Sequence, residues 1–166
     1  MIRFLNKETE LHLLEQLFDL LYENMAEIAP PGLPYEAEKQ QFLSNVRPAM
    51  EKAPRQIVLM YDEDALAGYL QYYVNNGIFM VEEIQIRKGF RSTSLFAQLW
   101  KFMAEMIPVD TQYIEAYADM RNLPSRRLIA KLGMNAVGET PDGACLHFRG
   151  AFRSMPILSR QRKFLL

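Results

Sequence analysis

The sequence is poor in cysteine and histidine, the residues that most often cross-link small folds or bind transition metals. Cys145 is the only cysteine among 166 residues, so an internal disulfide is excluded. Its position in an apolar run indicates a small buried hydrophobic residue rather than a nucleophile. His12 and His147 lie far apart and have no acidic companion at the spacing of metal ligands. The sequence therefore predicts no metal site.

Long hydrophobic runs are also absent. No stretch approaches about 18 consecutive apolar residues, and the first residues do not resemble a secretory signal peptide. We therefore expect a cytoplasmic protein that contacts no membrane. The apolar share of 49% and the charged share of 23% are typical of a globular domain. We place one such domain at residues 1–152, followed by a basic C-terminal tail at residues 153–166.

The net charge of −1 conceals two halves of opposite sign. Residues 1–83 carry 6 Lys and Arg residues against 14 Asp and Glu residues, whereas residues 84–166 carry 13 against 6. The second half is therefore the part expected to bind a polyanion, such as a phosphate-bearing cofactor. In the alternative, the two charged surfaces attract each other or a partner subunit, which makes a homodimer possible.

Hydrophobic periodicity and turn residues predict an alternation of helices and strands. Helices are expected from Lys7 to about Pro30 and over residues 35–50, 94–107 and 121–132. Strands are expected over residues 2–5, 56–61, 66–74, 78–87, 113–118, 135–139 and 144–149. Turn residues connect several of the strands, in the segments Asp62–Ala65, Asn75–Gly77 and Pro141–Gly143.

Between Ile78 and Gly138, the expected strands, loop and helices follow one another in the order typical of a nucleotide-cofactor site. An apolar strand leads into the loop Arg87–Ser94, which carries three cations, and then into a helix. The free N–H groups and the dipole of a helix N-terminus favour a phosphate group. The next helix is expected to stop at Gly133, because glycine can adopt the left-handed conformation that ends a helix.

Two motifs in this stretch resemble those of the GNAT superfamily of acyl-CoA N-acyltransferases. The segment Arg91–Phe96 is similar to the family's Gln/Arg-x-x-Gly-x-Gly/Ala loop, with Ser94 and Phe96 in place of the small residues. Asn122 and the segment Leu128–Met134 are similar to the family's later motif. Asn122 is also expected to act as the N-cap of the helix that follows it.

The resemblance covers roughly residues 1–150. It implies an α/β (α+β) fold with a central mixed, mostly antiparallel sheet of about seven strands flanked by four helices. It also implies acetyl-CoA as the cosubstrate. Amides near Ile84 and Ile86 would then stabilise the thioester oxyanion. The other cofactor-binding residues implied are Arg91, Ser92, Thr93, Ser94 and Leu95 at the diphosphate, Asn122 at the pantetheine arm, and Arg126 beside it.

An amine must lose a proton to attack a thioester, and a partly buried carboxylate can accept it. Glu82 and Glu83 are adjacent within one predicted strand, so strand alternation places them on opposite faces. Glu82 shares its face with Ile84 and is the preferred base. In the alternative, both acids lie at solvated edges or pair with Arg87 and Lys88.

Tyr117 is the candidate general acid that reprotonates the CoA thiolate. The family often places a tyrosine for this purpose where this sequence has Ile129. Tyr117 lies at the end of its predicted strand, near the expected cleft. The alternative interpretation is an ordinary aromatic residue of a strand.

The sequence thus predicts an N-acetyltransferase that moves an acetyl group from acetyl-CoA to a primary amine by direct attack, with an acceptor of unnamed class. One alternative is a protein of the same fold that has lost acyl transfer and acts as a binding or structural component. Another is a phage-type enzyme that modifies nucleic acid, whose basic tail would neutralise phosphates. More often, such a tail is a solvated chain end.

Overall fold

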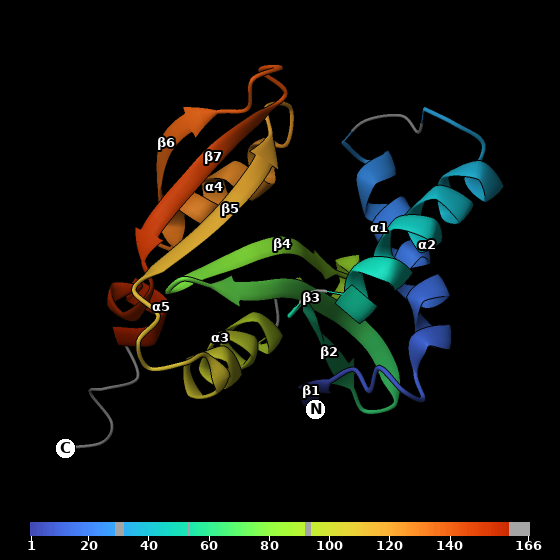
Figure 1. Ribbon diagram of the computed structural model, residues 1–166, viewed down its shortest axis with the longest axis horizontal. Helices are drawn as coiled ribbons and strands as arrows, with labels where there is room; N and C mark the ends of the chain where they lie inside the picture. Colours follow the sequence, from blue (N-terminus) through green and yellow to red (C-terminus); the bar gives the residue numbers. More distant parts are fainter. Residues whose placement is uncertain (29–31, 53, 92–93, 160–166) are drawn as a thin grey trace. The chain divides into compact units, whose positions relative to one another are not determined.

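Figure 1 shows a computed structural model of the protein, which describes residues 1–28, 32–52, 54–91 and 94–159. Seven strands form one sheet in the order β1-β2-β3-β4-β5-β7-β6. The strands are β1 (Ile2–Phe4), β2 (Gln56–Asp62), β3 (Ala65–Asn75), β4 (Ile78–Ile86), β5 (Tyr113–Asp119), β6 (Asn135–Glu139) and β7 (Cys145–Ala151). The mixed, mostly antiparallel sheet that the resemblance implies is confirmed.

Five α-helices and three short 3-10 helices accompany the sheet in the described part of the chain. The α-helices are α1 (Leu14–Ala26), α2 (Tyr35–Lys52), α3 (Leu95–Met106), α4 (Leu123–Lys131) and α5 (Pro156–Ser159). The 3-10 helices are η1 (Leu11–Leu13), η2 (Lys88–Phe90) and η3 (Phe152–Ser154). Within this part, no helix combines the length and the apolar character that crossing a bilayer requires.

The predicted turn between β3 and β4 is confirmed, and its conformation follows from local chemistry. Asn76 and Gly77 both have positive φ angles, 49° and 74°. Two consecutive positive φ angles define the tight turn that matches the twist of paired strands, and Asn-Gly tolerates them best. The turn therefore fixes where β4 begins.

The chain divides into two compact units. The first comprises residues 1–71 and 83–95. In it, β1 and β2 pair antiparallel, and α1 lies against α2, in blue and cyan in Figure 1. Ring contacts such as Phe18–Phe42, with centroids 5.4 Å apart, join these two helices. The buried core of the unit contains Leu14, Leu17, Leu20, Val46, Met50, Ile57, Leu59 and Tyr69.

The second unit comprises residues 72–82 and 96–166. In it, β5 pairs parallel with β4 and antiparallel with β7, and β7 pairs with β6. The helix α4 contacts β5 and lies behind β5 and β7 in Figure 1. Three aromatic rings fill the core beside α3: Phe79 lies 6.2 Å from Trp100 and 5.3 Å from Phe152, between ring centroids.

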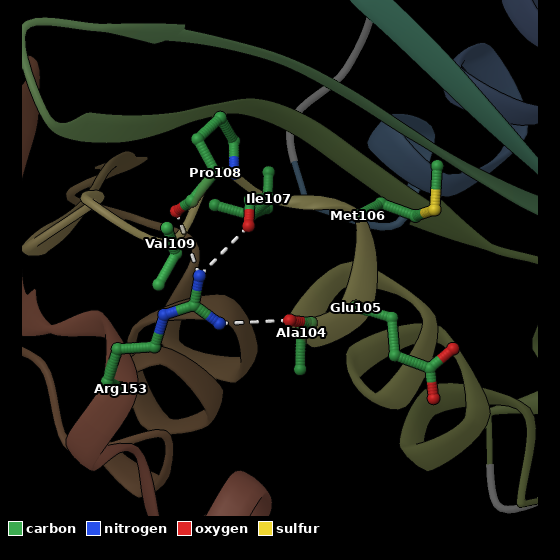
Figure 2. A pocket seen from close by; sticks show the side chains of 7 residues that line it. All are labelled: Ala104, Glu105, Met106, Ile107, Pro108, Val109 and Arg153. Carbon is green, nitrogen blue, oxygen red and sulfur yellow. Dashed lines mark hydrogen bonds between the residues drawn. The ribbon is translucent and has the colours of Figure 1, made fainter.

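The residues after β7 pack against the second unit as far as Ser159. Phe152 is fully buried, and Arg153 binds the end of α3 (Figure 2). Its guanidinium donates to the carbonyls of Ala104, Ile107 and Pro108, each at 2.9 Å. These contacts border a surface pocket of about 580 Å³ lined by residues 104–109 and Arg153. Arg160, Arg162 and Lys163, the other tail cations, lie outside the described residues.

The expected start of the first helix at Lys7 is wrong, because side chains stabilise a turn there instead. The amide of Glu8 donates to Asn6 Oδ1 at 2.9 Å. Glu10 accepts from the Asn6 amide at 2.8 Å and from both terminal nitrogens of Arg3 at 2.7 Å. Such side-chain bonds compete with helical backbone bonds. The α-helix therefore begins only at Leu14, after η1.

Candidate functional site

The parallel ladder between β4 and β5 is short and ends where two predicted catalytic residues follow. Ile78 to Val81 pair with Tyr113 to Ala116, and the pairing stops there although both strands continue. Glu82 and Tyr117 would form the next pair. Residues paired in a parallel ladder point to the same side of the sheet. The sequence-predicted base and acid are thus the residues that directly follow the last pair, at the point where the two strands cease to pair.

A buried carboxylate lies on the same face of β5, two residues before Tyr117. Glu115 is only 5% exposed. One of its oxygens accepts from Arg149, at 2.6 Å from Nε, and the other lies 2.8 Å from Nε2 of His147. Burial raises the pKa of Glu115, but the hydrogen bonds from Arg149 and His147 outweigh it and leave the pKa lowered. Glu115 is therefore ionised at neutral pH.

The register of β5 and β7 explains this cluster. Glu115 is paired with Arg149 and Tyr117 with His147, so all four side chains lie on one face. The rings of Tyr117 and His147 stack, with centroids 4.6 Å apart and planes 12° from parallel. Tyr117 is 48% exposed, so one side of this stack faces solvent.

Sequence reasoning missed this cluster. It considered His147 only as a metal ligand and did not single out Glu115 or Arg149. The signal was present as two pairs of polar residues spaced two apart, Glu115 with Tyr117 and His147 with Arg149. The pairing register that joins them depends on residues 32 positions apart in the chain. Within the described residues, no group of three or more His, Cys, Asp and Glu side chains has the geometry of a metal site.

Glu83, the other predicted base, belongs to the first unit and has different partners. Its carboxylate accepts from the Tyr69 hydroxyl at 2.8 Å and from Gln85 Nε2 at 3.2 Å. Tyr69 is fully buried, and burial together with the neighbouring carboxylate raises its pKa well above the ordinary value. Tyr69 therefore stays protonated and donates to Glu83, which gives Glu83 a structural role in the core of this unit.

The loop after β4 is held by α1. The Arg91 guanidinium donates to Asn24 Oδ1 at 2.5 Å, to a Glu27 oxygen at 3.1 Å and to the Ile86 carbonyl at 3.1 Å. Lys88 Nζ donates to the second Glu27 oxygen at 3.1 Å. These hydrogen bonds lower the pKa of Glu27, that from Lys88 more than that from Arg91. Lys88 and Arg91, two of the three cations expected to attract phosphate, thus both bind the carboxylate of Glu27 at the end of α1.

The carbonyl of Ile86, at the end of β4, accepts two side-chain hydrogen bonds. Besides Arg91, the Asn24 amide nitrogen donates to it, at 3.2 Å, and also to Gln85 Oε1 at 2.8 Å. Arg87 forms a salt bridge with Glu23 of α1, and Lys88 forms one with Glu27, the C-cap residue of α1.

Of the predicted phosphate-binding residues, only some are described. Ser92 and Thr93 lie outside the described residues, Ser94 is exposed, and Leu95 is the first residue of α3. Phe96, which stands where the family has a small residue, packs its ring on Trp100 one turn later, with centroids 5.9 Å apart. Its ring thus has a partner on its own helix.

The N-terminus of α4 is capped as predicted. Asn122 accepts from the Ser125 amide at 3.0 Å, and Pro124 occupies the first turn. Arg126 donates to the Met120 carbonyl at 2.8 Å. The helix ends before Gly133, whose φ of 87° is the left-handed conformation expected there. The cap orients the first turn of α4 without any contribution from a ligand.

Neither a protein-family model nor a curated protein matches the sequence, but solved structures resemble the fold. PaiA N-acetyltransferase from Thermoplasma acidophilum, in complex with coenzyme A, has a TM-score of 0.70 at 12% identity, over 91% of this chain and 98% of that one. A GNAT-family acetyltransferase from Listeria monocytogenes has a TM-score of 0.62 at 14% identity, over 91% and 94%.

Aminoglycoside acetyltransferase AAC(6')-Ib, in complex with coenzyme A and kanamycin, has a TM-score of 0.64 at 17% identity, over 98% of each chain. At such identities the likeness establishes the fold. The chain therefore has the fold of the GNAT acetyltransferases, as the sequence motifs implied.

Proposed function

We propose that the protein is an acetyl-CoA-dependent N-acetyltransferase that acetylates a primary amine by direct attack. The observation that carries this proposal is the early end of the β4–β5 ladder, with Glu82 and Tyr117 at the first unpaired level. An acid and a phenol that directly follow the last pair supply the two proton-transfer groups that the reaction uses. The fold adds support, since similar structures were solved with coenzyme A and one also with an amine substrate, kanamycin.

The residues of the loop fit a phosphate-bearing cosubstrate. Lys88 and Arg91 place two cations just before α3, and a helix N-terminus favours an anion. We assign the diphosphate to Arg91, Ser92, Thr93, Ser94 and Leu95, the pantetheine arm to Asn122 with Arg126 beside it, and the thioester carbonyl to the amides near Ile84 and Ile86. Acetyl-CoA would supply the activated acetyl group.

The catalytic roles follow the same geometry. Tyr117 is the proposed general acid for the CoA thiolate. Of the two candidate bases, we prefer Glu82, because it directly follows the last residue of β4 that pairs with β5 and Tyr117 directly follows the partner of that residue on β5. A carboxylate at Glu82 would also attract the acceptor, which arrives as an ammonium ion at neutral pH.

The proposal is tested by following release of the CoA thiol from acetyl-CoA in the presence of kanamycin, 1,4-diaminobutane or Nα-acetyl-lysine methyl ester. We expect thiol release that depends on one of these amines, with an acetylated amine in the mass spectrum. Glu82→Gln should lower kcat/KM by about 10²-fold, the typical contribution of a general base. Glu36→Gln, which neutralises an exposed acid of α2, is the matched control.

A second candidate function is binding without acyl transfer. It is favoured by the contacts of Arg91, whose guanidinium is bound to Asn24, Glu27 and Ile86. If acetyl-CoA binds but none of the amines stimulates thiol release, this second function gains support. A nucleic-acid-modifying enzyme would instead bind DNA with an affinity that falls steeply as salt rises.

A further inference from the structure

The cluster of Glu115, His147 and Arg149 contains a histidine whose protonation can be deduced from its partners. The Glu115 carboxylate is ionised and can only accept hydrogen bonds. The ring nitrogen that faces it, Nε2 of His147 at 2.8 Å, must therefore carry a proton. In the neutral ring, the other nitrogen, Nδ1, then holds a lone pair and is the basic atom.

This basic nitrogen is available. Among the residues that the structure describes, no side chain or backbone group is hydrogen-bonded to Nδ1 of His147. The side chain of His147 is 22% exposed, whereas that of Glu115 is 6% exposed. The ring is also fixed in position, because Tyr117 stacks on it and the Glu115 carboxylate accepts a hydrogen bond from it. A buried acid that orients a more exposed histidine is the arrangement of a positioned proton acceptor.

The ring also lies at the level where the β4–β5 ladder has ended. Tyr117 is paired with His147 across β5 and β7, and Glu82 would be the next partner of Tyr117 on β4. Tyr117 and His147 therefore lie on one face, and Glu82 directly follows the last residue of β4 that pairs with β5. The strand of the proposed acid Tyr117, β5, lies between β4 and β7.

On the basis of the proposed function, we propose that His147 accepts the first of the two protons that the ammonium group loses, and that Glu115 is its positioning residue. Glu82 attracts the ammonium group by charge and remains the base for the second proton. His147 Nδ1 removes one proton from the ammonium ion and later releases it to solvent. The freed amine forms the N–C bond to the thioester carbonyl, and the C–S bond breaks. Glu82 takes the second proton from the nitrogen and releases it to solvent. Tyr117 passes its proton to the CoA thiolate and regains one from solvent, so the amide keeps one N–H.

The first test compares His147→Ala with the wild type, using acetyl-CoA and whichever of kanamycin, 1,4-diaminobutane and Nα-acetyl-lysine methyl ester the wild type acetylates. We expect kcat/KM to fall by about 10²-fold. Free imidazole added to His147→Ala should restore part of the lost rate, which a structural role would not allow. The matched control is His12→Ala, the other histidine, which is exposed on η1. His147→Gln serves if the alanine variant does not fold.

The second test does not depend on an acceptor. The chain has two histidines, so the imidazole nitrogens of a ¹⁵N-histidine-labelled sample give two sets of signals that His12→Ala assigns. In the neutral form of the His147 ring, we expect the proton on Nε2 and none on Nδ1. In Glu115→Gln, Arg149 would keep the amide oxygen and turn the NH₂ toward the ring, so the proton should move to Nδ1.

The outcomes separate the two proposals. Absence of acetyl-CoA binding by the wild type in calorimetry would overturn the proposed function, and with it this inference. If the wild type acetylates an amine but His147→Ala keeps its rate within about threefold, only the assignment of His147 is wrong. The same holds if imidazole rescues nothing while His147→Ala still binds acetyl-CoA, or if the neutral wild-type ring carries its proton on Nδ1.

Discussion

At the residue scale, the close approach of backbones decides which positions tolerate a side chain. Gly68 of β3 is such a position: a Cβ built there would lie 2.5 Å from the carbonyl oxygen of Gln85 and 2.9 Å from Met60 Cε. The side chain of Met60 can rotate away, but the carbonyl belongs to β4 and can move only with the strand. Gly68 therefore sets the spacing of β3 and β4 beside the residues that precede the loop.

We predict that Gly68→Ala destabilises the protein by about 1–3 kcal/mol, the usual cost of overpacking. Urea unfolding measures this as a lower transition midpoint with an unchanged slope. Gly89→Ala is the control, since a Cβ at Gly89 meets nothing within 4 Å. Equal midpoints for the two variants would contradict the assignment of a steric role to Gly68.

Residues also show which predictions from sequence succeed. Asn122 was predicted as a cap and Asn76-Gly77 as a turn, and both are confirmed, because their chemistry acts over three or four neighbouring residues. The role of His147 was missed, because it depends on a partner 32 residues away in another strand. A register error of one residue would turn that side chain to the opposite face.

At the element scale, the start of the first helix shows how a charged side chain overrides helical periodicity. Glu10 joins Arg3 of β1 to the amide of Asn6, and these hydrogen bonds lower its pKa to about 2. A carboxyl group whose pKa is depressed in the folded state stabilises that state above its ordinary pKa, and this stabilisation is lost as the pH falls through the depressed value.

We therefore expect Glu10→Gln to be less stable than the wild type at pH 7, with a difference that shrinks as the pH falls from about 4.5 toward 2. Urea unfolding midpoints of both proteins across this range provide the measurement. Glu36→Gln should show no such pattern, since that acid is exposed on α2. A difference that stays constant down to pH 2 would show that Glu10 acts by packing and not by charge.

A second element, the segment after β7, carries a cation that binds the C-terminal end of a helix. Arg153 donates to three carbonyls at the end of α3, as Figure 2 shows. The last carbonyls of a helix lack intrahelical partners and carry partial negative charge. A guanidinium stabilises them both by donating hydrogen bonds and by its positive charge. Composition identified this residue only as part of a basic tail, because its partners lie more than 40 residues away.

We predict that Arg153→Ala lowers stability by about 1–2 kcal/mol, from the loss of charged hydrogen bonds and of the helix-end interaction. Thermal unfolding followed by circular dichroism measures the effect. Arg127→Ala removes an exposed arginine of α4 and should leave the midpoint nearly unchanged. If both variants unfold at the same temperature, the guanidinium contributes nothing to the end of α3.

At the scale of the whole molecule, the order of elements was predictable and the chemistry only in part. Strand and helix periodicity fixed the order of the elements and, with the motifs around Arg91 and Gly133, the fold. The partners of Arg91 were not predictable, because they come from α1, more than 60 residues earlier in the chain. The acyl acceptor also leaves no signature in the sequence, and the fold alone does not name it.

The proposed acetylation requires that the protein first bind acetyl-CoA, and isothermal titration calorimetry measures that binding directly. The account predicts one site per chain with a dissociation constant between about 1 μM and 1 mM, the range usual for enzyme substrates. Adenosine should bind much more weakly, because it lacks the diphosphate and the pantetheine arm. Absence of heat from acetyl-CoA up to about 1 mM would contradict the account.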